Sequence, residues 1–300
     1  SSTVTLDHTG FVTDKAKEEL LDINGLSINC RSWGNRKAKS AIVMLHGYAE
    51  TSRIWDDAAQ DLSRDYHVIA IDQRGYGRSS YSKDLDYGRA AQVDDLNKLI
   101  QEKKLTSISL VGHDMGAANA ITYAADNPEI ITAMVLVEAA PDVLRKGVEN
   151  IRKLVSIGDK FASVESAMAL FKDYFPYANN DQLRRRVQSI LKMDDKDQFF
   201  YWDFDPEFKN PTARPLDGAI QKKGTDLWEM IDRIQCPTMF VRGTHSDLIT
   251  PQVMQRMHRR MPGSRISLIE EAGHAVPTDQ PGQLALNIRE FLQNLSNNVF

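Results

Sequence analysis

The stretch VGHDMGAANA, residues 111–120, places a carboxylate between two glycines where an apolar run ends. Gly112, Gly116 and the small residues that follow are typical of a sharp strand-to-helix turn, G-x-nucleophile-x-G, which projects its central side chain. That central residue is Asp114, and an aspartate with a pKa of about 4 is ionised at neutral pH. It could therefore attack an electrophilic carbon directly, whereas a serine would first need a base.

The elements that would position this carboxylate are apolar, β-rich runs alternating with amphipathic helical stretches. Because the runs are apolar throughout, they indicate strands covered by helices on both faces, in a mostly parallel, doubly wound α/β sheet. A further pair of strands around 19–33 is expected to pair antiparallel at one edge. The predicted parallel strands are 41–47, 66–72, 108–114, 133–140, 237–243 and 265–274.

The alternation stops after Pro141 and resumes at residue 237. Between them lie helical patterns and an aromatic run, FFYWDFDPEF, with no pattern typical of a buried strand. We therefore expect a core domain made of residues 1–141 and 229–300. Residues 142–228 are expected to form a helical cap over the ends of the strands.

Several motifs, in this order, resemble the α/β-hydrolase superfamily over essentially the whole chain. The resemblance implies the α/β-hydrolase fold, and it implies a structural turn at D-x-R-G-x-G-x-S, residues 72–79. The other motifs match the family's oxyanion loop, acid loop and histidine loop, which are His46-Gly47-Tyr48, Gly243-Thr244-His245-Ser246-Asp247 and Gly273-His274.

Carried over to these positions, the resemblance implies Asp114 as nucleophile, His274 as base and Asp247 as acid. Glu138 is an alternative acid, because some family members place the acid after the preceding strand. The backbone N–H groups of Tyr48 and Met115 would form the oxyanion hole. The histidine would activate water against an alkyl-enzyme ester formed on the aspartate.

With an aspartate at the centre of this strand-to-helix turn (the nucleophile elbow), the chain resembles epoxide hydrolases and haloalkane or haloacid dehalogenases. Met115 stands where the haloalkane group commonly has tryptophan, while Tyr174, Tyr177 and Tyr201 could donate protons to an epoxide oxygen. These features favour an epoxide hydrolase, although the oxyanion loop HGYAE lacks the proline found in that family.

Three alternatives stay open beside the epoxide hydrolase. Trp202 could bind a halide, which would make the chain a dehalogenase. The C-terminal half resembles ester, lactone and C–C bond hydrolases, in which Asp114 would act as a base on water. A non-catalytic ligand-binding or signalling homologue would follow if Asp114 could not turn over substrate.

The resemblance implies a small-molecule substrate, and composition indicates no nucleic-acid or membrane partner. The net charge of −4 gives no indication of nucleic-acid binding, and the basic run QLRRRVQ, residues 182–188, is interpreted as a solvated helix. No apolar run of about 18 residues indicates a membrane span. Two cysteines favour a reducing, cytoplasmic location. The sequence has no HExxH, CxxC, P-loop or GxGxxG pattern, so we expect neither a metal nor a cofactor. We expect the protein to be a monomer or a homodimer.

Overall fold

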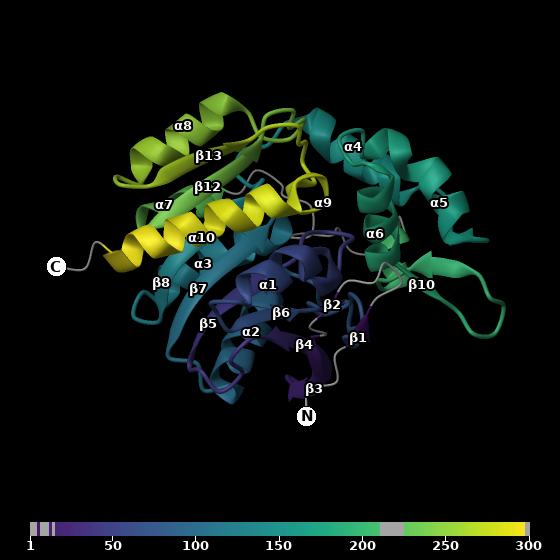
Figure 1. The fold of residues 1–300 in the computed structure, drawn as a ribbon, viewed down its shortest axis with the longest axis horizontal. Coiled ribbons are helices and arrows are strands. Elements are labelled where there is room, and N and C mark those ends of the chain that lie inside the picture. The colour runs from purple at the N-terminus through teal and green to yellow at the C-terminus, as the bar shows by residue number, and fades with distance from the viewer. Residues whose placement is uncertain (1–4, 7–11, 14–15, 211–224, 298–300) are drawn as a thin grey trace.

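A computed structural model describes residues 5–6, 12–13, 16–210 and 225–297, and an eight-stranded sheet forms its centre (Figure 1). The strand order is β13-β12-β8-β7-β5-β6-β4-β3. Neighbours from β13 to β6 are parallel, while β4 and β3 add an antiparallel edge, as the sequence predicts. The strands are β3 (Lys17–Ile23), β4 (Leu26–Trp33), β5 (Ser40–Leu45), β6 (Val68–Ile71), β7 (Ser107–His113), β8 (Ile131–Val137), β12 (Thr238–Gly243) and β13 (Arg265–Ile269). This is the predicted doubly wound α/β architecture.

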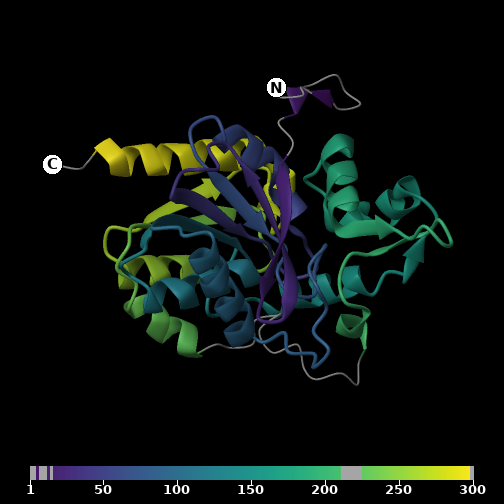
Figure 2. The same cartoon turned by 90° about the horizontal axis from the view of Figure 1, so that it is seen from below.

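Helices cover both faces of this sheet, which is why its strands are apolar throughout (Figures 1 and 2). On β5, Val43 and Leu45 pack toward one layer, and Ile42 and Met44 toward the other. The first layer contains α2 (Arg89–Glu102), α3 (Met115–Asp126), α7 (Thr225–Asp232) and α8 (Pro251–Arg260). The second contains η1 (Ser52–Trp55), α1 (Asp56–Leu62) and α10 (Pro281–Asn297).

The segment after β8 forms a separate lobe beside the sheet, drawn in teal and green in Figure 1. Its helices are α4 (Arg145–Val155), α5 (Val164–Phe171), η2 (Lys172–Tyr174), α6 (Asn180–Ile190) and η3 (Pro206–Lys209). It also holds a small antiparallel sheet of β9 (Lys160–Phe161), β10 (Leu191–Met193) and β11 (Phe200–Trp202), which the sequence did not predict. Strands of two or three residues are too short to show a period-2 pattern.

The predicted end of the cap at residue 228 falls inside α7. Leu227 and Trp228 of this helix belong to the apolar cluster beside α3 and the sheet, and not to the cap. Residues 211–224 lie outside the described part of the chain.

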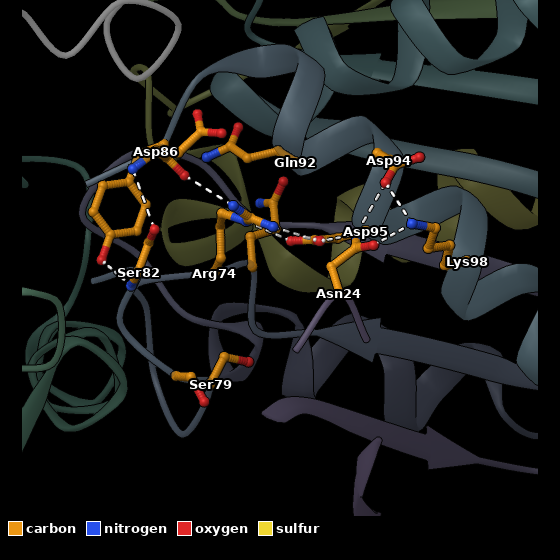
Figure 3. Close-up of polar contacts among 12 residues, drawn as sticks. Asn24, Arg74, Ser79, Ser82, Asp86, Gln92, Asp94, Asp95 and Lys98 are labelled. Carbon is orange, nitrogen blue, oxygen red and sulfur yellow. Dashed lines mark hydrogen bonds and ion pairs between the residues drawn. The ribbon is translucent and has the colours of Figure 1, made fainter. Parts of the chain in front are cut away.

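The loop after β6 carries D-x-R-G-x-G-x-S, and its side chains form structural contacts (Figure 3). The guanidinium of Arg74 donates to both carboxylate oxygens of Asp95, at 2.7 and 2.8 Å, and to the backbone carbonyl of Asp86 at 3.0 Å. Asn24 donates to the same Asp95 carboxylate at 2.7 Å. Both members of the Arg74–Asp95 pair are buried, so the motif joins the β6 loop to α2.

Candidate active site

Asp114 stands at the turn between β7 and α3, in the strained conformation that the motif predicts. Its backbone has φ 54° and ψ −118°, which non-glycine residues rarely adopt. Glycine is required on both sides of Asp114, because neighbouring backbone atoms leave no room for a Cβ there. A Cβ at Gly116 would lie 2.2 Å from the carbonyl oxygen of Leu45, and one at Gly112 would lie 2.5 Å from Ala117. The fold therefore holds the Asp114 carboxylate out of the sheet at this turn.

The two oxygens of the Asp114 carboxylate have different neighbours. Oδ2 accepts a hydrogen bond from the backbone N–H of Tyr48 at 3.1 Å. Oδ1 lies 3.7 Å from Nε2 of His274. The Asp114 side chain accepts no hydrogen bond from the first turn of α3, so of the two expected oxyanion donors only the N–H of Tyr48 donates to it.

The carboxylate beside Nδ1 of His274 belongs to Glu138 and not to Asp247, the acid that the sequence favoured. Nδ1 of His274 lies 3.1 Å from Oε1 of Glu138, whose side chain is fully buried directly after β8. The same carboxylate accepts from the backbone N–H of Gly243 at 3.0 Å and from the hydroxyl of Ser246 at 2.6 Å. The alternative acid of the sequence analysis thus occupies this position.

Asp247 is turned toward the cap instead. Its Oδ2 accepts a hydrogen bond of 2.6 Å from the side chain of Asn150 on α4. The loop after β12 reaches Glu138 through the neighbouring Ser246, which leaves Asp247 on the pocket wall. A G-x-x-S-D pattern does not reveal which of its two polar side chains faces the histidine.

The environment of His274 favours its protonated form. Burial alone lowers the pKa of the imidazole, but the hydrogen bond to Glu138 and the charges of Asp114, Glu138 and Asp247 together raise that pKa to about 9. In the free protein at neutral pH, His274 is therefore an imidazolium beside the Asp114 side chain. Neutralising Asp114 would remove one of the charges that raise this pKa.

A buried polar cluster beside the elbow was missed in the sequence. Oε1 of Glu50 accepts from Nδ1 of His113 at 2.6 Å and from the backbone N–H of Gly47 at 2.7 Å. Nε2 of His113 lies 2.8 Å from the carbonyl oxygen of His274, and Arg186 of the cap binds the other oxygen of Glu50. The residue that could have indicated this cluster in the sequence is Glu50, a carboxylate three residues after Gly47 in HGYAE.

A cavity of about 360 Å³ lies above Asp114 and His274, between the core and the cap. Three of the four side chains expected to bind substrate line it, namely Tyr174, Tyr177 and Trp202. Tyr201 does not: it precedes Trp202 on β11, where successive side chains point to opposite faces, and its hydroxyl binds Asp197.

The aromatic side chains of the cavity differ in their polar contacts. The ring of Tyr177 stacks on His245, with centroids 4.5 Å apart and planes within 6°. The hydroxyls of Tyr174 and Tyr177 have no hydrogen bond to another described residue and are available as donors. The indole N–H of Trp202 is buried, also without a partner among the described residues.

Within the described ranges, no group of three or more histidine, cysteine or carboxylate side chains is arranged to hold a metal ion. In the same residues, no helix is long and apolar enough to span a membrane.

Several known proteins similar to this chain are hydrolases. A family model described as "alpha/beta hydrolase fold" matches residues 40–281. An esterase of Mycobacterium tuberculosis is 26% identical over 89% of this chain and 86% of its own. A 2-(acetamidomethylene)succinate hydrolase of Mesorhizobium japonicum is 25% identical over 87% of this chain and 90% of its own. A crystal structure of E-2-(acetamidomethylene)succinate hydrolase superposes with a TM-score of 0.81 at 22% identity, covering 93% of this chain and 99% of that one.

Proposed function

Since the chain belongs to the α/β-hydrolase fold family, we propose that it is a hydrolase in which Asp114 is the covalent nucleophile. The observation that carries the proposal is the orientation of the Asp114 carboxylate. Oδ2 already accepts the Tyr48 N–H, so Oδ1, facing the cavity beside His274, is the free nucleophile. The substrate class that fits best is a small epoxide.

In the first step, Oδ1 attacks an epoxide carbon, forming an ester bond to that carbon and breaking its bond to the ring oxygen. The resulting alkoxide takes a proton from the His274 imidazolium, directly or through the hydroxyl of Tyr174 or Tyr177. Asp114 is then a neutral ester. Having given up its proton, the imidazole of His274 is neutral, and the ester no longer carries the Asp114 charge that helps to raise its pKa. The imidazole can therefore serve as a base.

In the second step, His274 removes a proton from water, and the hydroxide adds to Cγ of Asp114. The negative charge of the tetrahedral intermediate develops on Oδ2, which already lies at the Tyr48 N–H. Collapse breaks the bond between Cγ and Oδ1, and the leaving alkoxide takes the proton of the new carboxylic acid. The diol departs, and the Asp114 carboxylate and the His274 imidazolium are restored.

Hydrolysis of an ester or lactone is the second candidate, and the names of the relatives favour it. The relatives reported above are described as an esterase and as a hydrolase of 2-(acetamidomethylene)succinate. In that case Asp114 would act as a general base on water. The substrate carbonyl would then need the Tyr48 N–H that Asp114 Oδ2 occupies, which makes this candidate weaker.

The experiment that tests the proposal is intact-protein mass spectrometry of His274→Gln after exposure to epoxides, alkyl halides and activated esters. Without its base the second step stops, while the hydroxyls of Tyr174 and Tyr177 remain as donors to the alkoxide of the first step. We therefore expect an epoxide to add its full mass to the peptide that contains Asp114. An alkyl halide that adds its alkyl group alone would instead assign a dehalogenase, with Trp202 N–H as a halide donor.

The matched control is the double variant Asp114→Asn, His274→Gln, which should stay unmodified. If His274→Gln remains unmodified by every epoxide and halide, while the wild-type protein hydrolyses esters, the covalent scheme is wrong and the second candidate replaces it.

A further inference from the structure

Three consecutive arginines on α6 have different environments, although the sequence suggested that all are solvated. Arg184 pairs with Glu165 and has a 43% exposed side chain, and Arg185 pairs with Asp57 at 54% exposure. The Arg186 side chain is only 6% exposed. It crosses from the cap into the core.

The carboxylate that Arg186 meets there is Glu50, whose side chain is 2% exposed. Arg186 binds Oε2, while Oε1 is held by His113 and Gly47. Burial alone would raise the pKa of Glu50, but the charges of His113 and Arg186 hold that pKa well below its ordinary value. Glu50 is therefore an ionised carboxylate at the junction of cap and core, shared by a cap cation and a core histidine.

His113 connects Glu50 to the loop that carries His274. Nδ1 of His113 faces the Glu50 carboxylate at 2.6 Å, and Nε2 faces the carbonyl oxygen of His274 at 2.8 Å. Both partners are acceptors, so both hydrogen bonds form only when the ring is doubly protonated. The rings of His113 and His274 also lie 5.0 Å apart between centroids. The position of His274 thus depends on that of Glu50.

We propose that Arg186 is a positioning residue, which docks the cap helix α6 on Glu50 and, through His113, fixes His274 for the hydrolysis of the alkyl-enzyme. The helix is placed for this role, because α6 packs on η1 and on α9 (Val276–Asp279), which directly follows the His274 loop. Arg186 also lies 3.3 Å from the hydroxyl of Thr278 on α9.

The consequence for catalysis is selective, and this part of the inference rests on the proposed function. Attack by Asp114 needs the elbow, whereas hydrolysis of the ester needs His274 to be aligned with a water molecule. A misplacement on the order of 1 Å can cost about a hundredfold in rate. Loss of Arg186 should therefore slow the second step by roughly ten- to a hundredfold and leave the first step nearly unchanged.

The test compares Arg186→Met with its neighbour Arg185→Met, which removes an exposed arginine from the same helix. Single-turnover mass spectrometry with the reactive epoxide should show the alkyl-enzyme accumulating in Arg186→Met only. Arg186→Lys keeps the charge but loses the planar fork, so it should show an intermediate rate and also serves if Arg186→Met does not fold. A wild-type rate of ester hydrolysis in Arg186→Met, or in Arg186→Lys if that variant stands in for it, would overturn the proposal.

A second measurement needs no substrate and separates this inference from the proposed function. In nitrogen-15 NMR spectra the ring N–H signals of His113 should shift or broaden in Arg186→Met and stay unchanged in Arg185→Met. If the wild-type protein forms no adduct, the proposed function fails, and these signals alone decide the coupling. Unchanged signals of His113 and His274 in Arg186→Met would refute it.

Discussion

At the scale of single residues, the carboxylate that lies beside His274 could not be chosen from the sequence. Two carboxylates follow neighbouring strands, and local pattern favours Asp247. The choice depends on a backbone φ of 53° at Glu138 and on the hydroxyl of Ser246, which binds Glu138 from another loop. Contacts between residues more than a hundred positions apart are not visible in local spacing. The proximity of Asp114 and His274, by contrast, was predictable because each follows a strand in a recognisable turn.

Mutation of Glu138 and mutation of Asp247 are expected to change kcat by different amounts. Glu138→Gln removes the negative charge beside Nδ1 of His274 and leaves only a neutral amide there, so kcat should fall by roughly a hundred- to ten-thousandfold. Asp247→Asn keeps an oxygen for Asn150 and should change kcat by less than about tenfold. Steady-state kinetics of both variants on one substrate is the measurement. A larger loss in Asp247→Asn than in Glu138→Gln would mean that Asp247, and not Glu138, is the functional acid.

At the scale of elements, the parallel strands were predictable because burial on both faces makes them apolar throughout. The cap was harder. Its three short strands pair only with one another, and Tyr201 faces outward while its neighbour Trp202 faces the cavity. Arg186 was missed because a run of arginines on a helix is usually solvated, and only the core surface beneath α6 shows which one is buried.

The turn that carries Asp114 gives a prediction about stability. Gly116→Ala places a Cβ against the backbone of Leu45, where no flexible side chain can yield, so unfolding free energy should fall by about 2–4 kcal/mol. Gly282→Ala is the control, because a Cβ there meets nothing within 4 Å and α10 gains helix propensity. Urea unfolding of both variants measures the difference. Equal stability of the two would show that the elbow is less tightly packed than these distances imply.

At the scale of the whole molecule, the charges around His274 link protonation to folding. The folded protein raises the pKa of His274 from 6.5 to about 9, so it binds this proton more tightly than the unfolded chain does. The resulting stabilisation is fully present below about pH 6.5 and is lost as the pH rises through about 9. Its size is up to about 3 kcal/mol.

Unfolding free energies of the wild-type protein and His274→Gln, measured by urea denaturation between pH 6 and 10, test this linkage. We expect the wild-type value to fall more steeply across that window, because the variant lacks the titrating group. Parallel curves for the two proteins would mean that His274 is not held as an imidazolium beside Asp114.

The central claim is that Asp114 forms a covalent bond with the substrate, and oxygen exchange tests it most directly. The wild-type protein hydrolyses substrate over many turnovers in water enriched in oxygen-18. The mass of the peptide that contains Asp114 is then measured by mass spectrometry. Because each cycle replaces the Oδ1 oxygen by one from water, we expect oxygen-18 in the Asp114 carboxylate. An unlabelled Asp114 after many turnovers, with oxygen-18 found in the product alone, would show that water attacks the substrate directly.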